Sequence, residues 1–153
     1  MTNIFVDADA CPVKEEVYKV ALRHQIKVWI VSNGGIRPQK NPLLESIFVQ
    51  DGLDEADDWI AERAKKGDIV ITSDIPLASR CIENGSLVVS ANGEIYNESN
   101  IGNILSRRNI MTEIRSADPF YKGTGKPFSN RDRSRFLNAL EGQVRLVIKT
   151  KKF

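Results

Sequence analysis

A chain of 153 residues has the length of about one domain and can bury a core without cross-links. Its 41% hydrophobic and 27% charged residues are typical of a globular protein and exclude disordered and fibrous classes. No apolar run approaches the ~18 residues that span a bilayer. The N-terminal residues also lack the basic and apolar regions of a secretory signal. We therefore expect a cytoplasmic protein with no membrane partner.

The net charge of +2 conceals an uneven distribution along the chain. Residues 1–106 carry 10 Lys and Arg against 16 Asp and Glu, whereas residues 107–153 carry 12 against 4. This division suggests a bound metal in one part and a bound anion in the other, although a solvated basic tail explains the second part equally well. We expect a single domain over 1–153, with an α/β body at 1–111 and a basic loop, helix and tail at 112–153.

The first half of the chain alternates short strands with helices. Thr2–Val6 has the β-branched and aromatic character of a buried strand, and Pro12 suits the first turn of a helix that ends near Arg23. Lys27–Val31 is a second strand, closed by a glycine-rich turn, and Ser46–Val49 is a third.

The second half continues this alternation. A helix from 53 to 66 ends before Gly67, and Asp68–Thr72 has the continuous apolar centre of a strand covered on both faces. Further expected elements are a helix ending at 84–85, a strand at 87–89, a helix at 97–110, a long loop at 112–129 and a helix at 130–140. The last residues, 141–153, fit either a strand or a loose basic tail.

Strands that alternate with helices predict an α/β fold with a mostly parallel sheet and right-handed crossovers. The ligand site of such a sheet lies beyond the C-terminal ends of its strands. Asp7 and Asp9 follow the first strand two residues apart, and Asp74 follows the fourth. If these strands are parallel neighbours, the three carboxylates lie at one edge of the sheet.

The helix that begins near residue 53 carries two further candidates. Asp57 lies at the margin of the apolar stripe of this helix, and Asp58 lies further round. Several carboxylates in one cleft repel each other and raise one another's pKa, so a cation is needed to neutralise them. An all-oxygen, water-rich site suits Mg²⁺ or Mn²⁺ and the metal-assisted hydrolysis of a phosphodiester.

Each aspartate taken alone has a simpler explanation. Asp74 is a natural helix N-cap, and acidic residues at positions 57 and 58 are favoured near a helix N-terminus. Their combination at strand ends is what favours a shared site. The predicted catalytic and metal-binding residues are Asp7, Asp9, Asp57, Asp58 and Asp74.

Eight basic residues lie on or beside the long loop, and an arginine makes paired hydrogen bonds to phosphate. They are Arg107, Arg108, Arg115, Lys122, Lys126, Arg131, Arg133 and Arg135. We expect Arg131 and Arg133 to bind substrate phosphate. Phe120, Tyr121 and Phe128 could stack on bases or anchor the loop to the core.

Polar residues at two strand ends complete the candidate site. Asn33 and Ser73, with the neighbouring Ser32 and Thr72, are expected to orient substrate or water, although turn formation explains all four equally well. Trp29 and Trp59 are expected in the core.

The chain resembles the YaiI/YqxD family of uncharacterised bacterial proteins in the stretches VDADACPVK and GLDEADDWIAERAKKGDIVITSDIPLA and in the later PF-SNRDRSRFLNAL segment. That family is similar to PIN-like nuclease domains, which hold Mg²⁺ or Mn²⁺ on acidic residues of a Rossmann-like sheet. The resemblance implies a Rossmann-like, three-layer fold. It also implies that Asp7 is the first-strand aspartate, Asp57 and Asp58 the pair on the central helix, and Asp74 the later strand-end aspartate. Asp9 matches the family's own DAD.

These observations predict a divalent-metal-dependent nuclease or phosphodiesterase that acts on nucleic acid, with RNA favoured. One alternative is a non-catalytic RNA- or nucleotide-binding module. Another is a haloacid-dehalogenase-type phosphatase with Asp7 as nucleophile, because DADAC resembles that family's DxDx[TV] motif, although Cys11 in the fifth position counts against it. The oligomeric state stays open.

Overall fold

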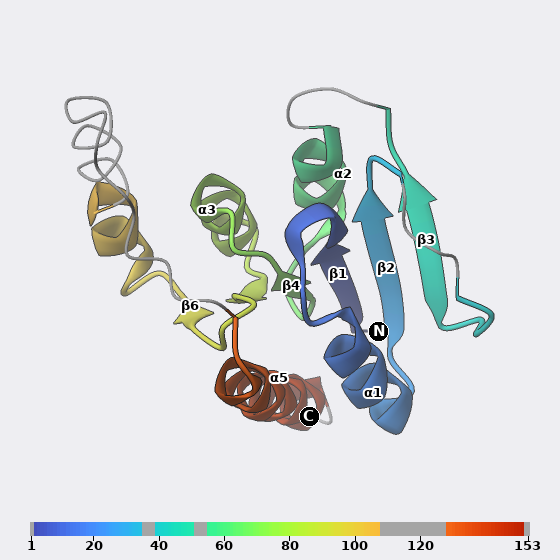
Figure 1. Cartoon of the computed structure of the whole chain (residues 1–153). Coiled ribbons are helices and arrows are strands. Elements are labelled where there is room, and N and C mark those ends of the chain that lie inside the picture. The colour runs from blue at the N-terminus through green and yellow to red at the C-terminus, as the bar shows by residue number, and fades with distance from the viewer. Residues whose placement is uncertain (1, 35–38, 51–54, 108–127, 152–153) are drawn as a thin grey trace.

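A six-stranded sheet forms the centre of the computed structural model, which describes residues 2–34, 39–50, 55–107 and 128–151 (Figure 1). Its strand order is β3-β2-β1-β4-β5-β6. Parallel pairing joins β1 (Asn3–Asp7), β2 (Lys27–Ser32), β3 (Leu44–Phe48), β4 (Ile69–Ile71) and β5 (Leu87–Val89). The short β6 (Ile95–Tyr96) is antiparallel to β5. The prediction of a mostly parallel α/β sheet is confirmed.

Helices cover both faces of this sheet, as Figure 1 shows. On one face lie α1 (Lys14–His24), which follows a 3₁₀ turn at Ala8–Ala10, and the long α5 (Asn130–Lys151). On the other lie α2 (Glu55–Arg63), α3 (Ile75–Glu83) and a helical stretch at 101–107. None of the helices in the described part of the chain is long and apolar enough to cross a membrane.

The apolar runs of the strands are explained by burial on two sides. Along β1, Ile4 and Val6 belong to the core beneath α1 and α5, whereas Phe5 belongs to the core beneath α2 and α3. Both cysteines, Cys11 and Cys81, are free and buried, as expected for reduced thiols that pack like small apolar residues.

The direction in which the sheet grows reverses between β1 and β4. From β1 the chain builds outward through β2 and β3, and it then returns to the other side of β1 with β4 and β5. Open α/β sheets bind their ligands at such a reversal, outside the C-terminal strand ends. Because Val6 is level with Ile71, the residues that follow, Asp7 and Thr72, lie side by side at this point.

The C-terminal segment is a single helix to Lys151, where the sequence also allowed a strand or a loose tail from 141 onward. Phe136, Leu140, Val144 and Val147 are all buried, at spacings of three and four residues, so one apolar stripe continues along the helix. The short β6 was not predicted from the sequence. Most of the expected loop at 112–129 lies outside the described residues, and the division of the chain at 111 stays a prediction.

The basic N-terminal part of α5 lies close to the turn between β5 and β6. Gly93 in this turn has a φ of 88°, and a Cβ there would be 2.7 Å from Arg135 Cγ. A side chain at this position would therefore be strained and would also collide with α5. The turn and the helix can approach each other only because residue 93 is glycine.

Four side chains connect α1 to the middle of α5. Glu141 of α5 accepts hydrogen bonds from Arg23 Nη1 at 2.7 Å and from Arg145 Nε at 3.1 Å, and it lies 2.6 Å from His24 Nε2. Burial opposes ionisation of Glu141, but the bonds from His24 and Arg23 outweigh it and lower the pKa of this carboxyl below its ordinary value.

Glu141→Gln is expected to lower the free energy of unfolding by about 1 kcal/mol at neutral pH. A carboxyl with a lowered folded-state pKa stabilises the fold above its unfolded pKa, and this contribution disappears as the pH falls through the folded pKa. The difference between the two proteins should therefore shrink below about pH 4.5, the ordinary pKa of a glutamate. Urea unfolding at several pH values measures it.

The control for this prediction is Arg145→Gln, because the Arg145 side chain is 73% exposed. Its loss should cost no more than a few tenths of a kcal/mol. An unchanged difference between wild type and Glu141→Gln from pH 7 to pH 3 would contradict the role given to the charged carboxylate.

Candidate functional site

A cavity of about 290 Å³ opens at the C-terminal ends of β1 and β4, where the sheet reverses direction. Its lining residues come from the ends of these strands, the start of α3 and the segment after β5. They are Asp7, Cys11, Ile71, Thr72, Ser73, Asp74 and Ala91. The cavity therefore combines two of the five predicted aspartates with hydroxyl groups and apolar side chains.

Thr72 connects the two aspartates of this cavity. Its Oγ1 donates a hydrogen bond to Asp7 Oδ2 at 2.9 Å and accepts one from the backbone N of Asp74 at 3.0 Å. Asp74 Oδ1 in turn accepts a hydrogen bond from the backbone N of Leu77 at 3.0 Å, as the N-cap of α3. The capping role considered from the sequence is confirmed, and it holds this carboxylate at the strand end.

Asp7 has an electrostatically unfavourable position. Burial raises the pKa of its carboxyl above the ordinary value, the Thr72 hydrogen bond opposes this, and the charges of Asp74 and Asp9 raise the pKa further. Asp74 and Asp9 are thus close enough to Asp7 for their charges to oppose its ionisation. A group with these properties in a cleft is a candidate functional residue.

Asp9 lies in the 3₁₀ turn after β1 and is exposed. Both of its carboxylate oxygens lie 3.2 Å from the backbone N of Asn33, just after β2. Asp9 therefore attaches the turn to the end of the neighbouring strand. Asn33, predicted to orient substrate, is exposed and contributes its main chain to this contact.

Asp57 and Asp58 lie on the first turn of α2 and do not line the cavity. Asp58 is paired with Arg80 of α3 at 2.8 Å. The hydrogen bond that Arg80 Nη1 donates to Asp58 Oδ1 raises the pKa of the Arg80 guanidinium, and the Asp57 charge adds to this. The structure therefore places Asp58 against α3, whereas Asp7 and Asp74 line the cavity, and a shared site for all five aspartates stays a prediction.

This edge of the sheet offers a divalent metal two carboxylates in one cavity, those of Asp7 and Asp74. Among the residues that the structure describes, no group of three or more His, Cys, Asp or Glu side chains is placed to hold a metal ion. Mg²⁺ does not need such a cage, since proteins usually bind it through one or two carboxylates together with water and substrate phosphate. Asp7 and Asp74 fit that kind of site, and the complete five-residue set stays a prediction.

The predicted phosphate-binding arginines lie at the start of α5. Arg133 Nη1 donates to the backbone O of Pro12 at 2.7 Å and to Glu16 at 3.2 Å, and its guanidinium lies 5.0 Å from the ring centroid of Phe128. Arg131, two residues before Arg133 on the same helix, is exposed. The basic helix end therefore adjoins the segment that joins Asp9 to α1.

Three lining residues, Cys11, Ile71 and Ala91, were not among the residues considered for the site from the sequence. Thr72 was considered from the sequence as a polar residue at a strand end, and the structure shows that its hydroxyl bridges Asp7 and Asp74. Ser73, which was predicted, is exposed, and its Oγ accepts a hydrogen bond from the backbone N of Ala91 at 3.3 Å. The sequence context of Cys11 carries no signal for a place in the cavity.

Asp7→Asn is expected to stabilise the metal-free protein by about 1 kcal/mol at neutral pH. An aspartate whose folded pKa is raised stabilises the fold most when protonated, and the fold loses stability as the pH rises through that pKa. Asparagine keeps an oxygen that can accept the Thr72 hydrogen bond but carries no charge. The gain should vanish near pH 3, where the wild-type carboxyl is neutral.

Thermal unfolding in EDTA at pH 7 and pH 3 measures this effect. The control is Glu83→Gln, an exposed change on α3 that should leave the melting temperature nearly unchanged. A lower melting temperature for Asp7→Asn at pH 7 would show that the ionised carboxylate stabilises the fold.

The fold and this cavity define an α/β protein that presents carboxylates at the reversal point of a mostly parallel sheet. Residues 5–145 match the family described as "Uncharacterized BCR, YaiI/YqxD family", and the chain belongs to that family. The resemblance noted in the sequence motifs is thereby confirmed.

Curated relatives match the chain over almost its entire length. It is 58% identical over 145 residues to a UPF0178 protein of Cereibacter sphaeroides, which covers 95% of this chain and 90% of the relative. It is 56% identical to a UPF0178 protein of Roseobacter denitrificans, over 95% of this chain and 96% of the relative. The identity to one from Rhodopseudomonas palustris is 52%, over 96% and 92%. No solved structure gives a significant match, so the likeness to PIN-like domains stays a prediction.

Proposed function

We propose that the protein is a cytoplasmic, divalent-metal-dependent phosphodiesterase that cleaves nucleic acid, with RNA as the favoured substrate. The observation that carries this proposal is the position of Asp7, which lines the cavity with Asp74 and is joined to it through Thr72. Its carboxyl has a raised pKa at the reversal point of the sheet, beside Asp74 and Asp9. Like charges gathered in a cleft destabilise the fold, and a bound cation would relieve that repulsion.

Within this proposal the residues of the cavity have separate roles. Mg²⁺ or Mn²⁺ would supply positive charge at the developing transition state and would acidify bound water. Asp7 and Asp74 would hold the ion, and Thr72 would keep both carboxylates oriented through its two hydrogen bonds. Asp9, exposed at the same edge, would orient water or accept a proton at a carboxylate oxygen.

The remaining predicted residues would act around this centre. Asp57 and Asp58 lie in the first turn of α2, on the face of the sheet that α3 also covers, and would position water or a second cation. Arg131 is exposed next to the segment before α1 and would contact phosphate, as would Arg133 if it exchanged its bond to Pro12 for a substrate oxygen. Asn33 and Ser73 are exposed at the strand ends, where a substrate would pass.

The test is cleavage of labelled single-stranded and double-stranded RNA and DNA by the purified protein. We expect cutting in Mn²⁺ or Mg²⁺, none in EDTA, and the highest rate on an RNA substrate. Absence of cutting on the whole panel would overturn the proposal and favour a binding module in its place. A trapped aspartyl-phosphate at Asp7 would instead identify a phosphatase.

A further inference from the structure

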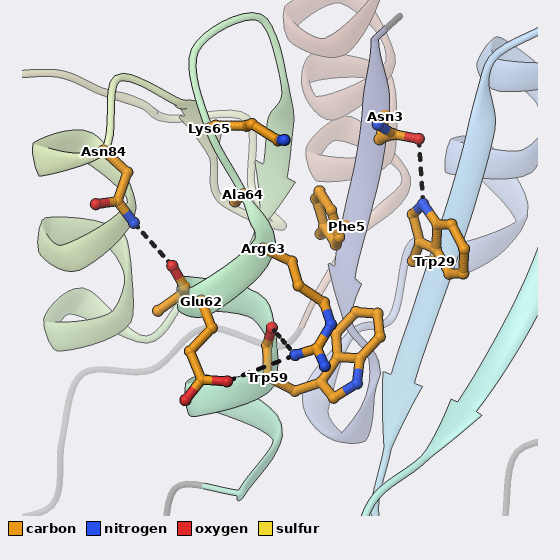
Figure 2. Close-up of a pocket in the computed structure, with 10 residues that line it drawn as sticks. Asn3, Phe5, Trp29, Trp59, Glu62, Arg63, Ala64, Lys65 and Asn84 are labelled. Atoms are coloured by element: carbon orange, nitrogen blue, oxygen red, sulfur yellow. Dashed lines mark hydrogen bonds and ion pairs between the residues drawn. The ribbon is translucent and has the colours of Figure 1, made fainter.

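A second and larger hollow lies on the α2 side of the sheet, toward the opposite strand ends (Figure 2). It has a volume of about 820 Å³ and lies between the last turn of α2 and the starts of β1 and β2. Its lining residues are Asn3, Phe5, Trp29, Trp59, Ala61, Glu62, Arg63, Ala64, Lys65 and Asn84. We call it the tryptophan groove, because both tryptophans of the chain line it.

The two indole rings are half-buried and face the groove, although the sequence placed them in the core. Their centroids are 6.0 Å apart with an angle of 47° between the planes, and Trp59 is also 6.1 Å from Phe5. Trp29 Nε1 donates a hydrogen bond to Asn3 Oδ1 at 3.1 Å, which holds its ring in place. The floor of the groove is therefore a fixed aromatic surface.

Cations border this aromatic surface on both sides. Lys27 Nζ is 4.9 Å from the Trp29 centroid, and Arg63 Cζ is 4.1 Å from the Trp59 centroid. Figure 2 shows the Lys65 side chain extending across the groove toward β1. Because Lys27 and Arg63 lie over the ring faces, a planar ligand that stacks on those faces displaces them, and their long side chains can then contact its phosphates.

The acidic residues near Arg63 and Lys27 form long and exposed ion pairs with them. Glu62 lies 3.7 Å from Arg63 with a side chain that is 68% exposed, and Glu45 lies 3.9 Å from Lys27 and is 48% exposed. Such exposed pairs contribute little and are readily replaced by another anion. The positive charge at the rim is thus available to a ligand that carries phosphate.

We propose that the tryptophan groove binds a nucleobase of a single-stranded nucleic acid. A planar base stacks on indole rings whatever its sequence, and flanking Lys and Arg side chains hold the phosphates on either side of it. The amides of Asn3 and Asn84 line the groove as well, where Asn3 Oδ1 accepts the bond from Trp29 and Asn84 Nδ2 donates to the backbone O of Ala61 at 2.8 Å. A purely apolar ligand would make no use of the positive charge of Lys27, Arg63 and Lys65.

The position of the groove connects it to the carboxylate cavity. Asn3, Phe5 and Asp7 alternate along β1 and point to the same face of the sheet, so the groove residues Phe5 and Asn3 lie about 7 and 13 Å from Asp7 along this strand. A single strand with one phosphodiester at the cavity could place a nearby base in the groove. The identity of the ligand as a substrate strand rests on the proposed function, whereas binding of a base does not.

Binding can be measured without metal and without cleavage. A dye-labelled single-stranded RNA is titrated in EDTA, with its anisotropy and the tryptophan emission recorded, and a duplex of the same sequence serves as comparison. We expect the emission to be quenched by the single strand and less by the duplex, whose bases are already stacked. Trp29→Leu and Trp59→Leu should each weaken binding about 5- to 150-fold, and the remaining tryptophan reports the quench.

Two further variants separate stacking from folding. Trp59→Phe keeps a ring and should retain most of the affinity, and Phe48→Leu removes an aromatic ring that is 54% exposed outside the groove and should change nothing. Unchanged affinity in both leucine variants, or equal binding of duplex with unaltered emission, overturns the nucleobase site. Cleavage that persists with normal KM in these variants would leave the phosphodiesterase proposal intact. Quenching of tryptophan emission by a single strand, in a protein that cleaves no substrate, would support the nucleobase site and overturn the phosphodiesterase proposal.

Discussion

Asp74→Asn is expected to reduce metal-dependent cleavage of nucleic acid by about 10²-fold or more with little change in stability. In the proposed site Asp74 contributes one of the two carboxylates that line the cavity, so its loss removes half of the negative charge that would hold the cation. Asparagine is as good an N-cap as aspartate. The bond from Leu77 N to the side chain at this position can therefore persist.

The measurement compares initial rates at saturating Mn²⁺ for wild type, Asp74→Asn and Glu83→Gln, with circular dichroism as a check of folding. The Glu83 variant removes an exposed carboxylate from the same helix and should cut like wild type. Asp74→Asn with a wild-type rate and an unchanged metal dependence would remove Asp74 from the site. A variant that is inactive and also unfolded would contradict the expectation of an intact cap.

Phe136→Ala is expected to lower the free energy of unfolding by about 3–5 kcal/mol. Phe136 is completely buried, and it is the largest fully buried side chain in the core that α1, α5 and the sheet form together. Its removal leaves a cavity beneath α5 that the surrounding strands cannot easily fill. This loss is a large part of the stability of a domain of this size.

Urea unfolding followed by circular dichroism measures the change. Phe136→Leu keeps most of the apolar volume and should cost much less, and Phe128→Ala, at a residue 36% exposed, should cost about 0.5 kcal/mol or less. If Phe136→Ala were as stable as Phe128→Ala, the basic C-terminal helix would be an appendage and not part of the core.

The comparison of sequence and structure is most favourable for the sheet. The continuous apolar run in β4 and the β-branched run in β1 were identified because buried parallel strands have no polar alternation. β6 escaped prediction because two residues at an antiparallel edge carry no periodic signal. The helical end of α5 was left open because its apolar residues become informative only when joined to Phe136 and Leu140 in one stripe.

The candidate site was predicted in part. The strand-end rule brought Asp7, Asp9 and Asp74 to one edge, and the structure places them there. The same reasoning could not foresee that Asp58 pairs with Arg80, because that contact joins two helices far apart in the sequence. It also could not predict that Thr72, and not Ser73, bridges Asp7 and Asp74, because both residues place a hydroxyl at the end of β4.

The sequence by itself determined the class of fold, the order of its main elements and the positions of the aspartates at the ends of the strands. These properties follow from local periodicity and turn chemistry, which each segment carries alone. Only the tertiary structure decided which aspartates share a cavity and which form an ion pair, and that both tryptophans face a groove. Those outcomes depend on contacts between segments such as α2 with α3 and β1 with β2, and such contacts exist only after the helices and strands have packed.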